Sequence, residues 1–189
     1  LKSKYSKVLE DDDKENFNEN LKIIGKQITQ IENLVNEFSD FARMSKPILK
    51  SNDLISIISD SIELLKNLDN KIAINFNHSK DKIFFNSDSE QISRVFVNLI
   101  KNSIESLQEK SIDMPHFNKK INIEIFEKDD YIESVIVDNG KGLSGLKDNI
   151  KSILNPYFTT KKKGTGLGLA IVNKIINDHN GSIKFIQLD

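Results

Sequence analysis

The stretch Gly164-Thr165-Gly166-Leu167-Gly168-Leu169-Ala170 places three glycines at alternating positions at the start of a predicted helix. Glycine lets backbone N–H groups approach an anion closely, and a helix N-terminus favours negative charge. The spacing is not that of a dinucleotide-binding fingerprint, and no Gly-Lys-Ser/Thr forms a Walker loop. The stretch therefore predicts a phosphate-binding loop, with a structural hinge as the alternative. Lys161, Lys162 and Lys163 precede it and are predicted to neutralise phosphates, although a solvated loop explains one or two of them equally well.

A second glycine-containing segment, Asp138-Asn139-Gly140-Lys141-Gly142, directly follows an apolar predicted strand. A carboxylate at a strand end, followed by glycines, predicts a tight turn that exposes the carboxylate to a cavity. An ionised carboxylate accepts hydrogen bonds, for example from the exocyclic amine of adenine. Taken alone, the segment is explained equally well as an ordinary Asp-Asn-Gly turn.

Two asparagines, Asn98 and Asn102, are separated by one turn of a predicted helix, so that their carboxamides share one face. Neutral oxygen ligands suit Mg²⁺, which keeps several waters and takes further ligands from substrate phosphates. In an asparagine-rich chain this pair is weak by itself. It gains weight only from its position relative to the two glycine segments.

The surrounding sequence predicts an α+β fold. Helices are predicted at 54–65, 88–110 and 168–178, and strands at 48–50, 72–76, 82–86, 121–128, 131–138 and 182–188. Asn52 or Asp53 is expected to cap the first of these helices, and Asp129-Asp130 is expected to form a tight turn. Irregular alternation around an adjacent strand pair favours a two-layer sandwich, with a mixed sheet on one side and helices on the other.

The N-terminal part carries one regular apolar stripe. Its members follow an alternating four-three spacing: Phe17, Leu21, Ile24, Ile28, Ile31, Val35, Phe38 and Ala42. Such a heptad pattern requires a partner helix, which favours a dimeric helical bundle over packing on the same chain. The acidic residues 10–13 are predicted to form a loop after the end of an earlier helix. Pro47 should end the long helix, which gives domains at 1–46 and 47–189.

Composition narrows the function classes. The chain has 189 residues, with 27 Lys+Arg against 28 Asp+Glu, and this balance argues against nucleic-acid binding driven by bulk charge. Cysteine is absent, which excludes disulfides, thiolate metal sites and cysteine nucleophiles. No apolar run approaches the length of about 18 residues that is typical of a membrane span, so membrane attachment is expected only through segments outside this chain.

In this order, the segments resemble the ATP-binding domain of sensor histidine kinases, in the superfamily shared with DNA gyrase, the mismatch-repair protein MutL and a heat-shock chaperone. Asn98-Leu-Ile-Lys-Asn102 resembles the N box, and Asp138 to Gly142 resembles the first glycine box. Asn155-Pro-Tyr-Phe158-Thr-Thr-Lys161 resembles the F box, and Gly164 to Leu169 resembles the second glycine box. The match extends from about Lys50 to the last residue. Residues 37–43, Glu-Phe-Ser-Asp-Phe-Ala-Arg, resemble the dimerisation and phosphotransfer region of NtrY- and NtrB-type kinases.

The resemblance implies a Bergerat-type ATP-binding fold and a set of site residues. Asp138 would bind the adenine amine, Asn98 and Asn102 would organise Mg²⁺ and phosphates, and 143–163 would form a mobile ATP lid packed down by Phe158. Lys161 and the backbone amides of 164–168 would hold phosphate oxygens. In full, it assigns ATP binding to Asn98, Asn102, Asp138, Gly140, Gly142, Phe158, Lys161, Gly164, Thr165, Gly166, Leu167 and Gly168, and Mg²⁺ to Asn98 and Asn102.

The resemblance also implies that the chain is part of a protein-histidine kinase, which would form homodimers through its N-terminal helices. The γ-phosphate would pass to a histidine and then to an aspartate of a response regulator. None of His78, His116 and His179 has the His-Glu-x-x-Asn-Pro context of the phosphoacceptor, and each is interpreted as an ordinary surface histidine. The chain is therefore expected to start just past the acceptor, to be truncated at its C-terminal end, and to bind ATP without phosphorylating itself. It would be the cytoplasmic portion of a parent protein that could be anchored in the bacterial inner membrane.

Three alternatives are an ATPase, a serine kinase of an anti-sigma system and a catalytically silent dimeric scaffold. Hydrolysing members of the superfamily resemble one another in having a glutamate where this chain has Asn98, and asparagine cannot serve as a general base near neutral pH. The heptad helix argues against the serine kinase, and the intact motifs argue against the scaffold.

Overall fold

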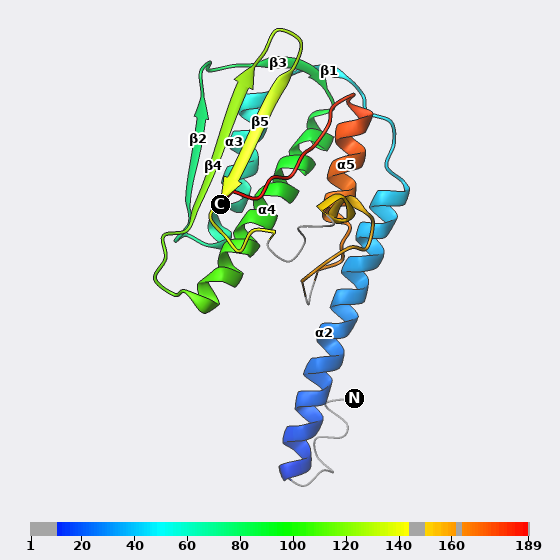
Figure 1. Cartoon of the computed structure of the whole chain (residues 1–189). Coiled ribbons are helices and arrows are strands. Elements are labelled where there is room, and N and C mark those ends of the chain that lie inside the picture. Colours follow the sequence, from blue (N-terminus) through cyan, green and yellow to red (C-terminus); the bar gives the residue numbers. More distant parts are fainter. Residues whose placement is uncertain (1–10, 144–149, 162–163, 189) are drawn as a thin grey trace. The chain divides into compact units, whose positions relative to one another are not determined.

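The computed structural model describes residues 11–143, 150–161 and 164–188, and these residues form two compact units. One unit contains the long helix α2 (Asp11–Ala42) and the described residues between Thr160 and Thr165 (Figure 1). The other contains the described residues from Ser45 to Thr159 and from Gly166 onward.

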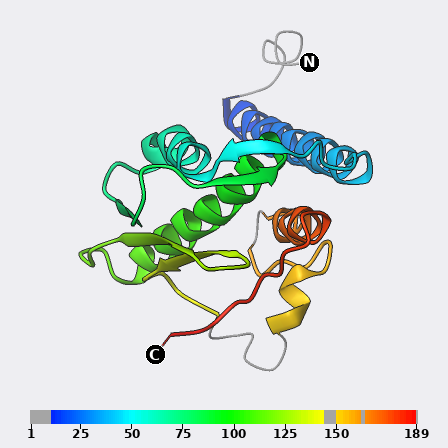
Figure 2. The same ribbon diagram turned by 90° about the horizontal axis from the view of Figure 1, so that it is seen from above.

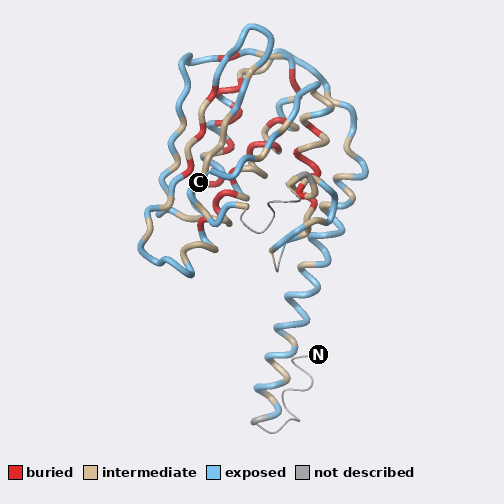
Figure 3. Tube along the Cα trace, viewed as in Figure 1, coloured by how far each residue is buried: buried red, intermediate tan, exposed pale blue. Residues whose placement is uncertain are grey.

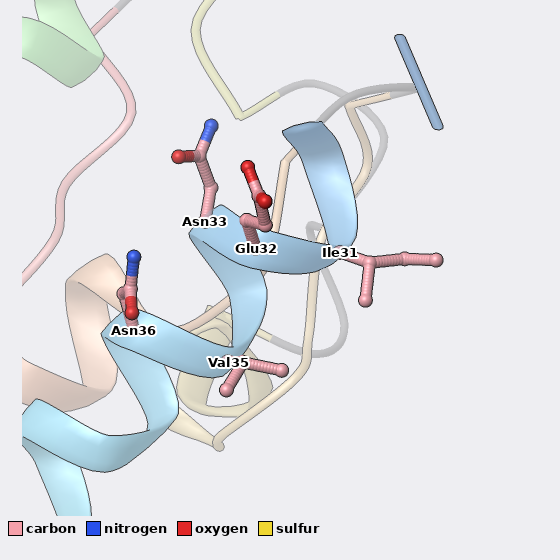
Figure 4. Close-up of a pocket in the computed structure, with 5 residues that line it drawn as sticks. All are labelled: Ile31, Glu32, Asn33, Val35 and Asn36. Atoms are coloured by element: carbon pink, nitrogen blue, oxygen red, sulfur yellow. The ribbon is translucent and has the colours of Figure 1, made fainter. Parts of the chain in front are cut away.

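Helix α2 carries the predicted apolar stripe along an exposed surface. Ile28, Ile31 and Val35 each remain more than half exposed, at 52%, 59% and 54%. Ile31 and Val35 leave the helix on one side, whereas Asn33 and Asn36 leave it on another (Figure 4). Among the residues that the structure describes, those that line the pocket in this view all belong to α2.

The second unit contains two small sheets. β1 (Lys50–Asp53) pairs with β3 (Phe84–Ser87) in antiparallel fashion. The other sheet has the order β2-β4-β5, formed by Ala73–His78, Lys120–Glu127 and Ile132–Asp138. β4 is parallel to β2 and antiparallel to β5, so this sheet is mixed.

Three α-helices and two short 3₁₀ helices accompany these strands in the described part of the second unit. They are α3 (Leu54–Leu65), α4 (Ser89–Asp113), α5 (Gly168–Asp178), η1 (Lys66–Leu68) and η2 (Ile150–Leu154). α3 and α4 lie against one face of the mixed sheet, and α5 lies beside α4 (Figure 1, Figure 2). The predicted α+β sandwich with a preceding long helix is confirmed.

The core lies between the sheet and α4 (Figure 3). Ile121, Ile123 and Ile125 alternate along β4 on the buried face, as a period-two strand requires. Ile100 of α4 is fully buried, and burial of one such side chain stabilises the fold by about 1.5–3 kcal/mol. The buried positions of α4 are Ile92, Val95, Phe96, Ile100, Ser103, Ile104 and Leu107. This packing fixes the helix whose other face carries Asn98 and Asn102.

Helix caps explain two of the boundaries. Asp53 is the N-cap of α3, and its carboxylate accepts hydrogen bonds from the backbone N–H of Ile55 and of Ile83, each at 3.1 Å. It therefore joins α3 to the segment that leads into β3. Asp88 caps α4 in the same way, accepting from Gln91 N at 3.1 Å.

Several sequence predictions differ from the structure. Asp11–Asp13 belong to α2 instead of forming a loop. Residues 182–188 form no strand, and Gln187 accepts a hydrogen bond from Leu143 N through its side chain instead. His179 is half-buried and hydrogen-bonded, so it is not an ordinary surface histidine. The predicted helix end at 1–8 lies outside the described residues.

Candidate nucleotide-binding site

The turn after β5 is held against α4. Gly140 N donates to Oδ1 of Asp138 at 2.9 Å, and Lys141 N donates to Oγ of Ser106 at 3.1 Å. A Cβ at Gly140 would lie 2.1 Å from Oγ of Ser106 and 2.9 Å from its backbone carbonyl carbon, so only glycine fits there. The half-buried Asp138 carboxylate is thereby fixed at the end of a strand, next to α4. Ser106 was not predicted from the sequence.

Asn139, in the middle of the same turn, extends the pairing of β4 and β5. Its Oδ1 accepts from Lys120 N at 2.8 Å, and its Nδ2 donates to the carbonyl oxygen of Asn118 at 2.7 Å. Lys110 of α4 donates through Nζ to the carbonyl oxygen of Asn139 at 2.7 Å. Asn139 is therefore a structural residue that supports Asp138.

The second glycine segment contacts the F box at Gly166. This residue has φ +71°, and a Cβ there would lie 2.5 Å from the carbonyl carbon of Tyr157 and 2.7 Å from the carbonyl oxygen of Phe158. Tyr157 N donates to Gly166 O at 3.0 Å. Tyr157 itself has φ 67°, which is uncommon for a residue with a side chain. Glycine is therefore required at 166 for this close backbone approach.

The same segment contacts the N box at Gly168, the first residue of α5. A Cβ on Gly168 would lie 2.9 Å from Oδ1 of Asn98. Asn98 donates through Nδ2 to the carbonyl oxygen of Arg94 at 2.8 Å, which orients its amide. Leu167 is fully buried and anchors the turn. The start of α5, where backbone N–H groups and the helix dipole favour an anion, thus lies beside a fixed amide oxygen.

The remaining predicted site residues are distributed between the units. Asn102 is half-buried on α4, one turn after Asn98, and Gly142 has φ +66° at the end of the Asp138 turn. Lys161, Gly164 and Thr165 belong to the unit of α2. Within that unit Gly164 N donates to Lys161 O at 3.3 Å, and the Thr165 hydroxyl donates to the carboxylate of Glu37. Contact of these three residues with phosphate stays a prediction.

The structure describes only part of the predicted ATP lid, 143–163. Residues 144–149 and Lys162 and Lys163 lie outside the described residues. Within the predicted lid, η2 forms at Ile150–Leu154 with Ile153 buried. Among the described residues, no three His, Cys, Asp or Glu side chains are grouped so that they could hold a metal ion by themselves.

A carboxylate at a strand end, a glycine turn on α4 and an anion-favouring helix start define a nucleotide-binding α+β domain. Residues 87–188 match the family described as "Histidine kinase-, DNA gyrase B-, and HSP90-like ATPase". The matched part is more than half of the chain and includes the contacts at Gly140, Gly166 and Gly168 described above. The chain belongs to this family.

Similar proteins include sensor kinases. A protein of Rickettsia felis named as an NtrY-like sensor histidine kinase is 34% identical over 181 residues, covering 96% of this chain and 28% of the relative. The nitrogen regulation protein NtrY of Azorhizobium caulinodans is 32% identical over 184 residues, covering 97% of this chain and 23% of the relative. The chain therefore spans about a quarter of the length of these curated relatives.

The fold is shared with a solved kinase complex. The crystal structure of histidine kinase ThkA with the response regulator protein TrrA matches with a TM-score of 0.68 at 23% identity. The match covers 95% of this chain and 49% of that chain. None of the helices described here has the length and apolar character needed to cross a membrane.

Proposed function

We propose that this chain is the ATP-binding catalytic part of a two-component sensor histidine kinase. The parent protein would transfer the γ-phosphate of ATP to a histidine outside this chain and then to an aspartate of a response regulator. The observation that carries the proposal is the contact of Gly168, at the start of α5, with the Asn98 amide. It joins two of the motifs on which phosphate binding would depend.

Each site residue would have a distinct role. Asp138, held by Gly140 at the end of β5, would accept a hydrogen bond from the adenine amine. Backbone N–H groups from Gly166 to Gly168 would hold phosphate oxygens at the start of α5. Lys161, Gly164 and Thr165 would join them there when nucleotide is bound, and Phe158 would pack the lid down.

Asn98 and Asn102 fit a magnesium ion that is carried by ATP. Mg²⁺ prefers oxygen ligands and keeps several waters, so one or two carboxamide oxygens beside the phosphates are sufficient. The Oδ1 of Asn98 already faces the start of α5, where the phosphates would lie. When bound, the ion would neutralise phosphate charge. The protein itself would orient the phosphates, and with asparagine at position 98 it places no general base beside them.

The identity of residue 98 favours transfer over hydrolysis. An asparagine amide accepts no proton near neutral pH, so Asn98 does not activate a water molecule. Phosphoryl transfer depends mainly on positioning and on neutralisation of charge, which a neutral amide and backbone N–H groups provide. The same reasoning disfavours the alternative of an ATPase.

The proposed partners follow from α2 and from the relatives. The exposed apolar stripe of α2 would pack against the same helix of a second copy, forming a homodimer. A response regulator receiver domain would be the phosphate acceptor, as suggested by the solved complex of ThkA with the response regulator protein TrrA. We propose a cytoplasmic location for this portion of the parent protein.

Calorimetric titration of the full chain with MgATP tests the nucleotide site. Replacement Asp138→Asn removes a charged acceptor and is expected to weaken ATP binding about 10- to 100-fold, the range for a lost charge-assisted hydrogen bond. Asp129→Asn, in the exposed turn between β4 and β5, is the matched control and should bind as the wild type does. Equal affinities of the Asp138→Asn variant and the wild type would contradict the proposed role of Asp138.

Three further outcomes separate the proposal from its alternatives. Release of free phosphate that is lost on Asn98→Ala would favour an ATPase. Radiolabel transferred from [γ-³²P]ATP to this chain alone would contradict the prediction that it lacks the phosphoacceptor. A wild-type chain that binds no ATP would favour a silent scaffold.

A further inference from the structure

His179, directly after α5, joins two helices through one side chain. Its Nε2 lies 3.0 Å from the backbone N of Asp88, and its Nδ1 lies 2.8 Å from the carbonyl oxygen of Ile175. A backbone N–H only donates, so Nε2 must accept and carry no hydrogen, whereas Nδ1 must donate to the carbonyl. The contacts therefore select the neutral Nδ1–H tautomer.

Asp88 is the point at which three segments meet. Its Oδ1 accepts from Gln91 N at 3.1 Å within the first turn of α4, and its Oδ2 accepts from Ile48 N at 3.0 Å. Burial alone would raise the pKa of Asp88, but the backbone hydrogen bonds from Ile48, Gln91 and Glu90, together with the nearby His179, outweigh it and lower the pKa, so this carboxylate stays charged. With the carboxylate occupied in this way, the backbone N–H of Asp88 bonds to His179.

The two helices that meet here are the ones that carry the proposed phosphate contacts. α4 and α5 run antiparallel and side by side (Figure 1, Figure 2). At one end His179 contacts Asp88, and at the other end Gly168 contacts Asn98. The sequence separations nearly match, 98 − 88 = 10 along α4 and 179 − 168 = 11 along α5, which correspond to about 15 Å and about 16.5 Å of helix.

Apolar packing between the helices does not by itself fix how far α5 slides along α4. The inward residues of α5 are Ala170, Ile171, Val172 and Ile175, and the hydrophobic effect that buries them is non-directional. A hydrogen bond at 3.0 Å is directional and weakens steeply when its geometry is lost. The His179–Asp88 bond is therefore the contact best able to set the axial register.

We propose that His179 is a positioning residue that holds α5 in register on α4, so that the start of α5 meets the amide of Asn98. The expected effect of His179 on ATP binding rests on the proposed function, whereas its expected effect on the Asn98–Gly168 contact does not. His179 touches no phosphate contact itself and acts over the length of α5. None of the sequence motifs includes it.

Two conservative variants separate this role from simple capping of α5. Counting bonds from Cα, Nδ1 of histidine and the amide of asparagine are both at the third bond, whereas Nε2 and the amide of glutamine are at the fourth. His179→Asn therefore keeps the contact to Ile175 O but cannot reach Asp88 N. His179→Gln reaches Asp88 N with its amide oxygen. Asparagine is also the better residue near a helix C-terminus, so a pure capping role predicts the opposite order.

The expected result for the full chain is that His179→Asn binds MgATP about five- to tenfold more weakly than wild type, as for one lost hydrogen bond. His179→Gln should bind MgATP within about twofold of the wild-type affinity, which is a smaller change than the loss of that hydrogen bond would cause. His116→Asn, in an exposed loop, is the matched control and should leave the affinity unchanged. Equal affinities of the Asn and Gln variants, or weaker binding by Gln, would overturn the proposal.

A nucleotide-free measurement makes the test independent of ATP binding. The nuclear Overhauser effect between the Asn98 side-chain amide and Gly168 Hα should persist in wild type and His179→Gln and weaken in His179→Asn. Ring ¹⁵N shifts of His179 should report the Nδ1–H tautomer. If no variant binds ATP but these signals behave as expected, the proposed function fails and the register role stands. If ATP binds but the Asn98–Gly168 signal is the same in all variants, the register role is wrong.

Discussion

Replacing Gly140 by alanine should disrupt the adenine end of the proposed site. The new Cβ would lie 2.1 Å from Oγ of Ser106, 2.6 Å from Oδ1 of Asp138 and 2.9 Å from the backbone carbonyl carbon of Ser106. Ordinary contact begins at 3.4 Å, so Ser106 Oγ must withdraw by 3.4 − 2.1 = 1.3 Å and the turn must move from the Ser106 backbone carbon by 3.4 − 2.9 = 0.5 Å. The serine hydroxyl can rotate, but the backbone carbon of α4 cannot, because α4 packs in the core.

The magnitude follows from the bonds that this movement breaks. Movement of the turn removes the hydrogen bond from Gly140 N to Asp138 Oδ1, and rotation of Ser106 removes the one from Lys141 N to Ser106 Oγ. At about 1 kcal/mol each, the two losses free the Asp138 carboxylate from its fixed position and should weaken ATP binding roughly 30-fold. Overpacking should also lower the free energy of unfolding by about 1–3 kcal/mol.

The assay combines calorimetric titration with MgATP and thermal unfolding of the full chain. Gly25→Ala is the control, because a Cβ there meets nothing within 4 Å in the middle of α2. It should stabilise the helix by about 0.5–1 kcal/mol and leave ATP affinity unchanged. Adding Ser106→Ala to Gly140→Ala should restore affinity only in part, since the backbone contact at 2.9 Å persists. Wild-type ATP affinity in the Gly140→Ala variant would refute the reasoning.

Two further predictions concern stability and assembly. The hydrogen bond from Lys119 lowers the pKa of Asp69 against the opposing effect of burial. The ion pair therefore stabilises the fold above pH 3.8, the ordinary pKa of the carboxyl group, and this stabilisation is lost as the pH falls through the lower pKa of the folded state. Lys119→Met should reduce this acid dependence, measured as the unfolding temperature between about pH 2 and 5; an unchanged profile would contradict the role of the pair. On α2, Ile28→Glu should convert the proposed dimer to a monomer in light scattering, whereas Asn33→Glu, off the stripe, should not; a wild-type chain that is monomeric would refute the dimer itself.

The elements that the sequence predicted best are those with long, regular apolar spacing. α4 was predicted over 88–110 and extends over Ser89–Asp113, and the β4–β5 pair was placed within one residue. In both cases a local period of 3.6 or 2 coincides with burial in one core. The family resemblance rested on the ordered motifs on these same elements.

Predictions were wrong where one local sequence pattern is compatible with two structures and contacts with another segment determine which of them forms. The apolar residues near the C-terminus alternate as a strand does, yet a strand exists only when its backbone bonds to a neighbour, and residues 182–188 make no such ladder in the described structure. The acidic run at Asp11–Asp13 suits a loop or a first helical turn equally. Ser106 and His179 carry no local signal, because their partners are 35 and 91 residues away.

Asn98 and Asn139 show why residue type alone could not identify the site. Both are asparagines in or next to a predicted motif of an asparagine-rich chain. Asn139 uses both ends of its amide to bond the backbone of Lys120 and Asn118, which extends a sheet. Asn98 donates to its own helix, and its oxygen is turned toward Gly168, where a helix dipole favours an anion. The direction of one amide oxygen, set by the bond to Arg94 and facing Gly168, 70 positions further along the chain, thus separates a structural asparagine from a candidate phosphate and magnesium ligand.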